Sequence, residues 1–323
     1  MPDVSVTTPD RLDFGEFVRL QREAFAAVIG DASMVDALSE PYYRWKYAPP
    51  AGQAKIALVR DQGRLVAANS MFPLQVRYAG TTVRAWQSCD TATHPDARRK
   101  GYFMKCLAAL REELGAGEIF FGFPNKNSSP GFLNFGWKLR GDVGTWLLVF
   151  PGRQLGSYRG VSEVSAFGEE QNRLAVRLGE LGRPLLDRSA AYMNWRYLEH
   201  PLNRYAAYAH AEGGMQVGAL VMRELDLRGR RLALVMEVQA VSGSAERQLL
   251  GFAAAWARSR RRWLTLVMDN ALRIRSGARS GFVEVPQRLL PKRQVLMGMT
   301  TGGIADDVWH REWHVQMGDW DGF

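Results

Sequence analysis

The stretch that decides the fold is residues 93–114, "THPDARRKGYFMKCLAALREEL", which follow the β-forming segment "VRAWQSCDTAT". A basic loop at 98–101 leads into a run whose apolar residues recur at helical spacing, namely Phe103, Cys106, Leu107, Leu110 and Leu114. The first turn of a helix presents unpaired N–H groups and a positive dipole end, and a glycine lets a ligand approach the backbone. The pattern predicts a seat for phosphate or pyrophosphate, with a solvated helix start as the alternative.

The segment "HPDARRKGYF" resembles the acyl-CoA-binding motif of the GCN5-related N-acetyltransferases (GNAT), which is Arg/Gln-x-x-Gly-x-Gly/Ala after a Pro-containing turn. Arg98 and Gly101 match the motif, whereas Phe103 stands where Gly or Ala is usual. The resemblance implies that acetyl-CoA or another acyl-CoA binds here. It places around the pyrophosphate Arg98, Arg99, Lys100, Gly101, Tyr102 and Phe103, and it assigns pantetheine contacts to the strand residues Thr91, Ala92 and Thr93. Ordinary strand threonines are the alternative for Thr91 and Thr93.

The composition is that of a globular protein large enough for two domains, with 323 residues, 46% apolar and 23% charged. No apolar run reaches the length of a membrane span, the N-terminus lacks signal-peptide features, and two cysteines form no disulfide framework. We therefore expect a cytoplasmic protein with reduced thiols. The net charge of +9, from 42 Lys and Arg against 33 Asp and Glu, favours anionic partners such as a phosphate-bearing cofactor or substrate.

The remaining sequence places this loop in a mixed α/β unit. Hydrophobic periodicity predicts helices at 11–29 and about 34–38. Three strands are expected over 55–90, with turns at 61–63 and 79–80. A strand at 118–125, a short helix or turn at 127–137 and a last strand at 143–150 follow the loop and its helix. A strand, a helix and a strand in succession around the loop indicate a parallel pair.

The second half repeats this plan in the same order. "YYRWKY" at 42–47 is echoed by "YMNWRY" at 192–197, an offset of 150, and the strand–turn–strand and strand–helix segments recur as well. We predict two tandem GNAT-like domains, 1–150 and 167–323, joined by a Gly- and Ser-rich linker at 151–166. The second half has "VSGSAERQ" instead of the basic loop, with Ser244 as a plain N-cap, so we expect one cofactor site and a degenerate second domain that shapes the substrate cleft.

Transfer of an acyl group from a thioester to an amine requires a base for the amine proton. Asp90, a carboxylate in an apolar strand just before the loop, is the first candidate, since burial raises the pKa of a carboxyl group. A structural aspartate that accepts backbone hydrogen bonds is the alternative. Glu237, in the comparable strand of the second half, is a candidate for a base or for binding the acceptor.

The resemblance assigns further roles. The tyrosine that usually protonates the leaving thiolate is replaced by Phe132, so another donor serves or the thiolate leaves unaided. Asn125 matches an asparagine that orders cofactor or substrate, with a simple turn residue as the alternative. Asp319 and Asp321 are expected to meet acceptor hydroxyl groups. No metal is expected, because the histidines near the C-terminus lack a His-Glu-x-x-His register.

The leading hypothesis is an acyl-CoA-dependent N-acyltransferase that moves an acetyl or other short acyl group to a primary amine. A duplicated unit of this length resembles a GNAT subgroup in which some members acylate the amine of a nucleotide-linked amino sugar. The alternative is a catalytically silent protein that binds acyl-CoA or a partner. A third class, a nucleic-acid binder using the arginine clusters, predicts steeply salt-dependent binding and lacks an aromatic-rich basic strand. A small-molecule acceptor is expected, and a homo-oligomer is compatible with the sequence.

Overall fold

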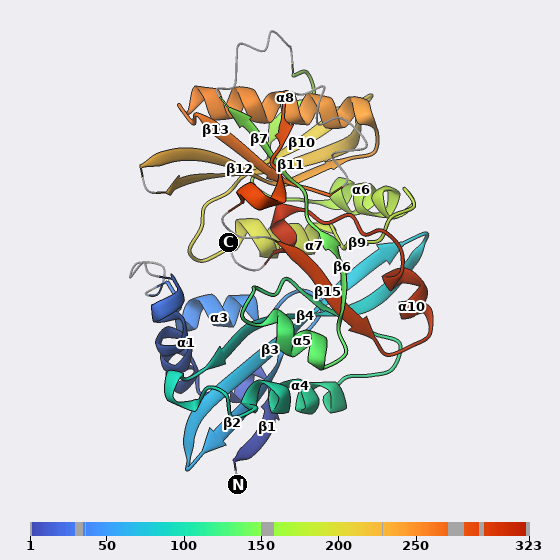
Figure 1. Ribbon diagram of the computed structural model, residues 1–323. Coiled ribbons are helices and arrows are strands. Elements are labelled where there is room, and N and C mark those ends of the chain that lie inside the picture. Colours follow the sequence, from blue (N-terminus) through green and yellow to red (C-terminus); the bar gives the residue numbers. More distant parts are fainter. Residues whose placement is uncertain are drawn as a thin grey trace.

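A computed structural model describes residues 2–29, 35, 37–149, 158–227, 229–270, 281–290 and 294–320, and it contains two mixed β-sheets (Figure 1). The first sheet has the order β1 (Asp3–Thr7), β2 (Lys55–Asp61), β3 (Arg64–Tyr78), β4 (Thr81–Thr93), β5 (Ile119–Gly122), β15 (Val295–Thr300) and β6 (Lys138–Asp142), and the short β9 (Leu185–Leu186) pairs with β3. The second has the order β14 (Val283–Glu284), β7 (Thr145–Val149), β13 (Leu264–Met268), β12 (Arg230–Ala240), β11 (Met215–Leu227), β10 (Ala206–Glu212) and β8 (Val161–Glu163). The predicted mixed α/β fold with two tandem units is confirmed.

The longer helices cover the sheets in equivalent ways. α4 (Tyr102–Glu113) packs on the outer face of the first sheet, and α8 (Gly243–Ser259) packs on the outer face of the second (Figure 1). Between the sheets lie α1 (Phe14–Ile29), α3 (Glu40–Lys46), α6 (Glu169–Gly179) and α7 (Ala190–Met193), which continues as the π-helical turn η3 (Asn194–Leu198). α5 (Ser129–Asn134), α10 (Ile304–Trp309) and the 3-10 turns η1 (Pro9–Arg11), η2 (Pro95–Ala97), η5 (Gln287–Leu289) and η6 (Met317–Asp319) complete the described elements.

The predicted parallel pair around the basic loop is present. β4 and β5 are parallel, with Ala85 opposite Ile119 and Gln87 opposite Phe121, and α4 connects them. β12 and β13 form the corresponding parallel pair of the second half, connected by α8. Both units therefore contain a strand–helix–strand crossover, in which the helix begins shortly after the end of the first parallel strand.

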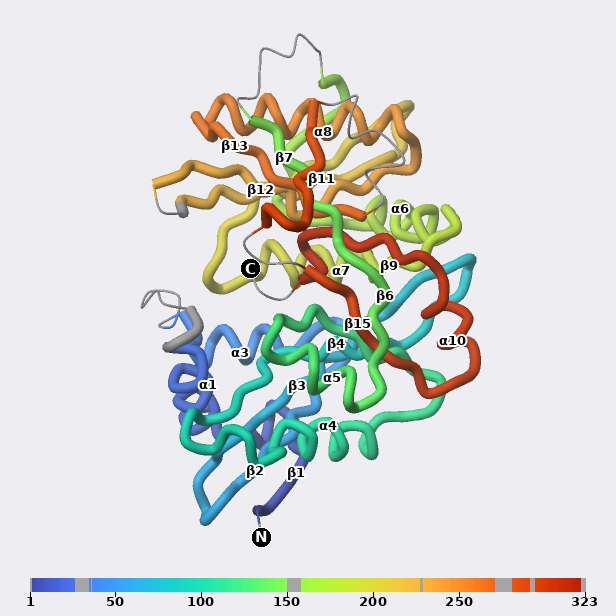
Figure 2. The backbone as a smooth tube through the Cα atoms, viewed as in Figure 1, coloured from blue at the N-terminus to red at the C-terminus, as the bar shows by residue number. Residues whose placement is uncertain are grey.

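Each half donates one strand to the sheet of the other half. β15, from the C-terminal half, lies between β5 and β6, while β7, from the N-terminal half, lies between β13 and β14. Figure 2 shows the exchange by colour, with red β15 beside the green β6 and green β7 beside the orange β13. The strand expected at 143–150 therefore exists, but it belongs to the second sheet. Neither predicted segment, 1–150 or 167–323, completes its sheet with its own strands.

The two echoed tryptophans pack against each other where the halves meet. The indole Nε1 of Trp45 donates to the carbonyl of Trp195 at 2.8 Å, and Nε1 of Trp195 donates to the carbonyl of Trp45 at 3.0 Å. Their rings stack with centroids 5.2 Å apart and an interplanar angle of 22°. Because the two bonds are reciprocal and join residues 150 positions apart, they are consistent with an approximate twofold axis between the halves at this point, as the repeat in the sequence implies.

Two details of the expected chain organisation change. Residues 161–163 of the expected linker form β8, which pairs with β10, and residues 151–157 lie outside the described part. Of the helical piece expected at about 34–38, residues 34 and 36 lie outside the described part. Across the described ranges, no helix is both long enough and apolar enough to span a bilayer.

Candidate active site

The basic loop keeps its main-chain N–H groups free of protein acceptors. Between η2 and α4, the amide of Arg98 donates weakly to Pro95 at 3.4 Å, but the N–H groups of residues 99–103 have no acceptor within the described chain. Gly101 is the N-cap of α4, with a φ of 75°, and no side chain caps the helix. A Cβ atom at Gly101 would meet no atom within 4 Å, so the space beside this residue is open. Such an arrangement favours an anion.

The equivalent helix of the second half satisfies its own N-terminus. The hydroxyl Oγ of Ser242 accepts from the amide of Ala245 at 3.2 Å, which makes Ser242 the N-cap of α8 instead of the predicted Ser244. Ser242 has extended backbone angles and reaches the third N–H group, as a serine cap does. The contrast between α4 and α8 supports one anion seat, located in the first half.

Several side chains of the loop also contact the protein. The hydroxyl of Tyr102 donates to Oδ2 of Asp61 at 2.7 Å, and Nζ of Lys100 lies 3.8 Å from the same oxygen. Arg98 donates from Nη2 to the carbonyl of Ala24 at 3.3 Å. The side chain of Tyr102 is therefore directed at β2, and its predicted place around the pyrophosphate stays a prediction. These contacts hold the loop between β2 and α1.

β4 separates from β5 beyond Gln87 and carries a β-bulge there. The parallel pairing ends at Gln87, so residues 88–93 have no described strand paired on their β5 side. Asp90 and Thr91 together oppose the single residue Asn69, whose Nδ2 donates to Oγ1 of Thr91. Asp90 has a φ of 50°, which the bulge imposes. The backbone of Thr91, Ala92 and Thr93 is placed along this opening, as the pantetheine prediction requires, and that role stays a prediction.

Asp90 lies in a buried polar cluster. Its carboxylate accepts from Nζ of Lys46 and from the hydroxyl of Tyr47, both at 2.9 Å, and Tyr47 is 2.8 Å from Oγ of Ser70. Only 11% of the Asp90 side chain and 5% of the Lys46 side chain are exposed. Burial and the charge of Asp90 raise the pKa of Tyr47 well above its ordinary value, so the phenol remains a donor. The role of Asp90 as a base stays a prediction, with Lys46 as its direct neighbour.

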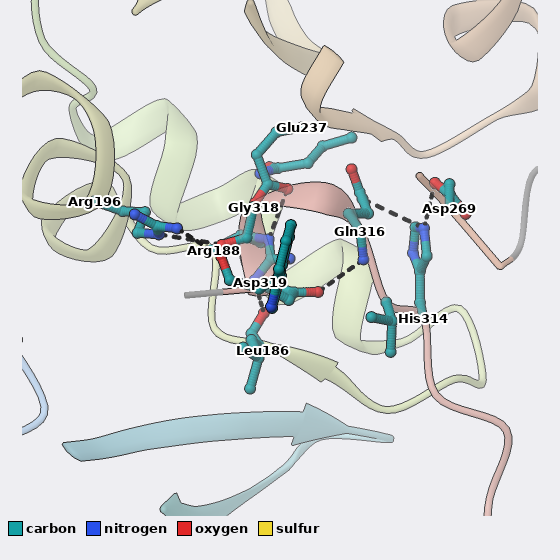
Figure 3. Close-up of polar contacts among 12 residues, drawn as sticks. Leu186, Arg188, Arg196, Glu237, Asp269, His314, Gln316, Gly318 and Asp319 are labelled. Carbon is teal, nitrogen blue, oxygen red and sulfur yellow. Dashed lines mark hydrogen bonds and ion pairs between the residues drawn. The ribbon is translucent and has the colours of Figure 1, made fainter. Parts of the chain in front are cut away.

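Glu237 has the same relation to a tyrosine in the second half, but it is fully enclosed. The hydroxyl of Tyr197 donates to Oε1 at 2.6 Å, and Nε of Arg188 donates to Oε2 at 2.9 Å (Figure 3). Burial raises the pKa of Glu237, although the charge of Arg188 opposes the shift. Its side chain has 0% exposure. The predicted catalytic role of Glu237 is untested, and the enclosed carboxylate does not reach a cleft.

Asp319 joins this network from the C-terminal segment. Its Oδ1 accepts from Nη2 of Arg188, and its Oδ2 accepts from the amide of Gln316 at 2.8 Å (Figure 3). Its carbonyl accepts from Nε2 of Gln87 on β4 at 2.9 Å, which joins the tail to the first sheet. The carboxylate expected to meet acceptor hydroxyls is therefore committed to the protein, and Asp321 lies outside the described residues.

A cleft lies where the two halves meet, beside the Lys46–Asp90 pair. It is narrow and open to solvent on one side, and it encloses about 10 Å³, which is room for about one water-sized group. Aromatic rings and polar groups from both halves line it, among them Trp45, Lys46, Gln87, Tyr192, Trp195 and Arg196. Its walls are of mixed aromatic and cationic character, and the substrate cleft expected between the halves stays a prediction.

Comparison with known families agrees with this geometry. Residues 6–140 match the model of the acetyltransferase (GNAT) domain. This part of the chain is therefore similar to a GNAT domain, and "GNAT domain" below denotes residues 6–140. No curated protein matches the chain.

Solved structures with this fold extend the likeness of the GNAT domain to the whole chain. A GCN5-related N-acetyltransferase from Anabaena variabilis aligns over 93% of this chain and 73% of its own, with a TM-score of 0.63 and 12% identity. A putative acetyltransferase from Pyrococcus horikoshii aligns over 99% and 95%, with a TM-score of 0.59 and 12% identity. N-myristoyltransferase from Saccharomyces cerevisiae, with bound myristoyl-CoA, aligns over 92% and 82%, with a TM-score of 0.59 and 9% identity. At these identities the likeness establishes the fold alone.

The GNAT domain departs from the usual motif at Phe103, and the structure accommodates the larger ring. Phe103 packs edge-on against Phe132, with centroids 5.0 Å apart, and lies directly over Gly131 of α5. A Cβ atom at Gly131 would come within 2.4 Å of Cε1 of Phe103. Phe132 is buried against Trp137 as well, with centroids 4.4 Å apart. The phenyl ring at 132 is thus part of the core of the GNAT domain and offers no proton to a leaving thiolate.

Asn125 serves as a turn residue in the GNAT domain. Its Oδ1 accepts from the amides of Asn127 at 2.8 Å and Ser128 at 3.1 Å, ahead of α5. This is the alternative that the sequence left open, and a contact with cofactor or substrate stays a prediction. In the described part of the chain no three His, Cys, Asp or Glu side chains gather as metal ligands do.

Sequence reasoning missed the residues that surround Asp90 and the cleft. Lys46 and Arg196 lie in the two echoed segments, "YYRWKY" and "YMNWRY", which were read only as a sign of duplication. The available signal was the shared pattern of the two segments, which have tyrosines, a tryptophan and, at equivalent positions, the cations Lys46 and Arg196. Asn69 offered no comparable signal, since a bulge on β4 has no reliable sequence pattern.

Proposed function

We propose that the protein transfers an acetyl or other short acyl group from an acyl-CoA to a primary amine. The observation that carries this proposal is the row of main-chain N–H groups at 99–103, which has no protein acceptor in the described chain and borders open space at the start of α4. Amides at a helix N-terminus suit the diphosphate of coenzyme A. The GNAT domain match supports the same cofactor class, and a myristoyl-CoA complex exists for one protein of this fold.

In this proposal the opened edge of β4 orients the cofactor. Beyond Gln87, main-chain groups of residues 88–93 have no described strand opposite them on that side. They would bond the pantetheine and place the thioester near the bulge at Asp90. An amide aimed at the thioester oxygen would stabilise the negative charge that develops during attack by the amine. The thiolate would leave without a proton from position 132, since Phe132 has none to give.

Asp90 is the proposed acceptor of the amine proton. Its carboxylate adjoins Lys46, which lines the cleft between the halves, so the amine can approach from that cleft. General base catalysis of this kind contributes about 10²- to 10⁴-fold to the rate. The amine of a nucleotide-linked amino sugar is the first acceptor that we would test. The alternative, a silent acyl-CoA binder, is favoured by the buried Phe132 and by the ion pair that occupies Asp90.

The experiment follows release of the free CoA thiol from acetyl-, propionyl- and butyryl-CoA across a panel of amines. We expect release with at least one amine, and D90N should lower kcat while leaving the thermal shift by acetyl-CoA unchanged. D226N, in an exposed ion pair with Arg262, is the matched control. A thermal shift without thiol release for any amine would favour the silent binder. Absence of both would show that the proposed function is wrong.

A further inference from the structure

The cleft between the halves contains a buried cation that no carboxylate of the described chain neutralises. Lys46, Arg188 and Arg196 are the buried lysine and arginine residues of the described ranges. Lys46 pairs with Asp90, and Arg188 pairs with two carboxylates. Arg196 is 6% exposed and forms no ion pair. Burial of a charge without a counterion is unfavourable unless something else compensates it.

The contacts of Arg196 leave one end of the guanidinium available. Nε donates to the carbonyl of Gly318 at 3.1 Å and Nη2 donates to the carbonyl of Trp320 at 3.0 Å (Figure 3). These acceptors are neutral, and Nη1 has no hydrogen-bond partner within the described residues. Since Arg196 lines the cleft, Nη1 is the donor that a bound molecule can meet. The edge formed by Nε and Nη2 is already occupied, so an anion would bind Nη1 from one side only.

The positive charge of Arg196 acts on the groups around it. His200, which packs against Trp45 with ring centroids 4.2 Å apart, has its pKa lowered to about 3 by burial and then by the charges of Arg196, Arg223 and Lys46. Rings of Tyr42, Trp45, Tyr192 and Trp195 form the remaining walls of the cleft. A cation among aromatic rings in a small cleft fits a compact molecule with an anionic group and a flat or apolar part.

We propose that Arg196 binds an anionic oxygen of the acceptor, so that the acceptor is a small amine that also carries a carboxylate or a phosphate. This inference rests on the proposed function, because it concerns the second substrate of the same reaction. Lys46, the ion-pair partner of Asp90, and Arg196 line the same narrow cleft, which is open to solvent and encloses room for about one water-sized group. A single anionic oxygen can therefore reach Arg196 while the amine of the same molecule faces Lys46 and Asp90. Charge-assisted hydrogen bonds to an arginine are among the stronger polar contacts in proteins.

The test compares matched amines that differ in the anion. Phenylalanine is compared with phenylalaninamide for the carboxylate, and phosphoethanolamine with ethanolamine for the phosphate. Both kcat/KM with acetyl-CoA and calorimetric binding without it are measured. In one pair the anionic member should be preferred by about tenfold or more, as expected for a hydrogen bond to a charged group. The pair that shows the preference identifies the anion.

Variants assign the preference to Arg196. R196Q should reduce it to less than about threefold, and R196K should retain part of it. R177Q is the control, because Arg177 also donates to a main-chain carbonyl, at 3.1 Å, but does not line the cleft. Equal use and equal binding of anionic and neutral members by the unmodified protein overturn the inference, even if R196Q fails to fold. Retention of the preference in folded R196Q overturns it as well. If no amine releases thiol, the proposed function fails, and the calorimetric comparison still decides whether Arg196 binds an anion.

Discussion

Substitution of Gly101 tests the anion seat most directly. G101V introduces an isopropyl group at a position where a Cβ atom would meet nothing within 4 Å, in the same loop as the amides of 99–103, which have no acceptor in the described chain. In our interpretation a diphosphate occupies this space. The substitution should therefore abolish binding of acyl-CoA by exclusion, in addition to a general effect on folding from the positive φ of 75°.

The two effects have different expected sizes. A left-handed conformation costs a non-glycine residue roughly 1–2 kcal/mol. Saturating ligand at about 100 times its Kd stabilises a protein by about 2.7 kcal/mol. With an unfolding entropy of about 2.1 cal/mol/K per residue, 323 residues give roughly 0.7 kcal/mol/K, so the ligand should raise Tm by about 4 °C. G101V should lower the Tm of the free protein by about 2 °C and should remove the ligand-induced rise.

Gly117 provides the matched control for the backbone effect. It has a φ of 76°, it also faces open space, and it lies in the turn before β5, away from the loop. G117V should lower Tm by a similar amount and should keep the full rise with acetyl-CoA. The assay is a thermal unfolding series with acetyl-CoA, with free CoA as a second ligand. A rise of about 4 °C that persists in folded G101V would refute the assignment of the diphosphate to this loop.

Two further predictions concern packing and acid stability. G131A should destabilise the fold by about 1–3 kcal/mol in urea unfolding, because its Cβ atom would lie 2.4 Å from Phe103. F103A in the same chain should restore most of the lost stability. Additive losses of the two substitutions would contradict this packing. The pKa of His200 is near 3 in the fold and 6.5 when unfolded, so the fold loses stability as pH falls below 6.5, by about 3 kcal/mol at pH 4. H200Q should therefore lose much less stability between pH 7 and pH 4 than the unmodified protein. The control H310Q, at an exposed position, should behave like the unmodified protein. Equal losses in all three proteins would show that His200 does not cause the loss of stability in acid.

The elements around the basic loop were predictable because local signals agree there. Apolar spacing places Cys106, Leu107 and Leu110 on the buried face of α4, and the structure confirms that helix as well as the three strands before it. The left-handed backbone at the N-cap position suits Gly101, which carries no Cβ atom. Each of these features depends on residues within a few positions of one another, which is the range in which sequence patterns are informative.

The exchange of strands and the cluster around Asp90 were not predictable for a physical reason. β7 and β15 are short apolar strands that fit a buried position in either sheet. Their composition therefore does not predict which of the two sheets they join. The pairing of Asp90 with Lys46 joins residues 44 positions apart through the end of a helix and a bulge. Ser242, rather than Ser244, caps α8 because backbone angles decide the choice between two nearby serines.

The C-terminal segment makes the two halves a single functional unit. Gln87 of the first sheet donates to the carbonyl of Asp319, while Arg188 and Arg196 of the second half bind the Asp319 carboxylate and the Gly318 carbonyl. A Cβ atom at Gly318 would lie 1.8 Å from the hydroxyl of Tyr197, so the segment packs against the centre of the molecule with no room to spare. Gln87, Arg196, Gly318 and Asp319 also line the cleft, so a molecule bound there would contact both halves. A separated GNAT domain would retain the loop at 98–103 and lose the wall that carries Arg196. Under the proposed function we therefore expect the separated domain to bind acyl-CoA and to lack a complete acceptor site.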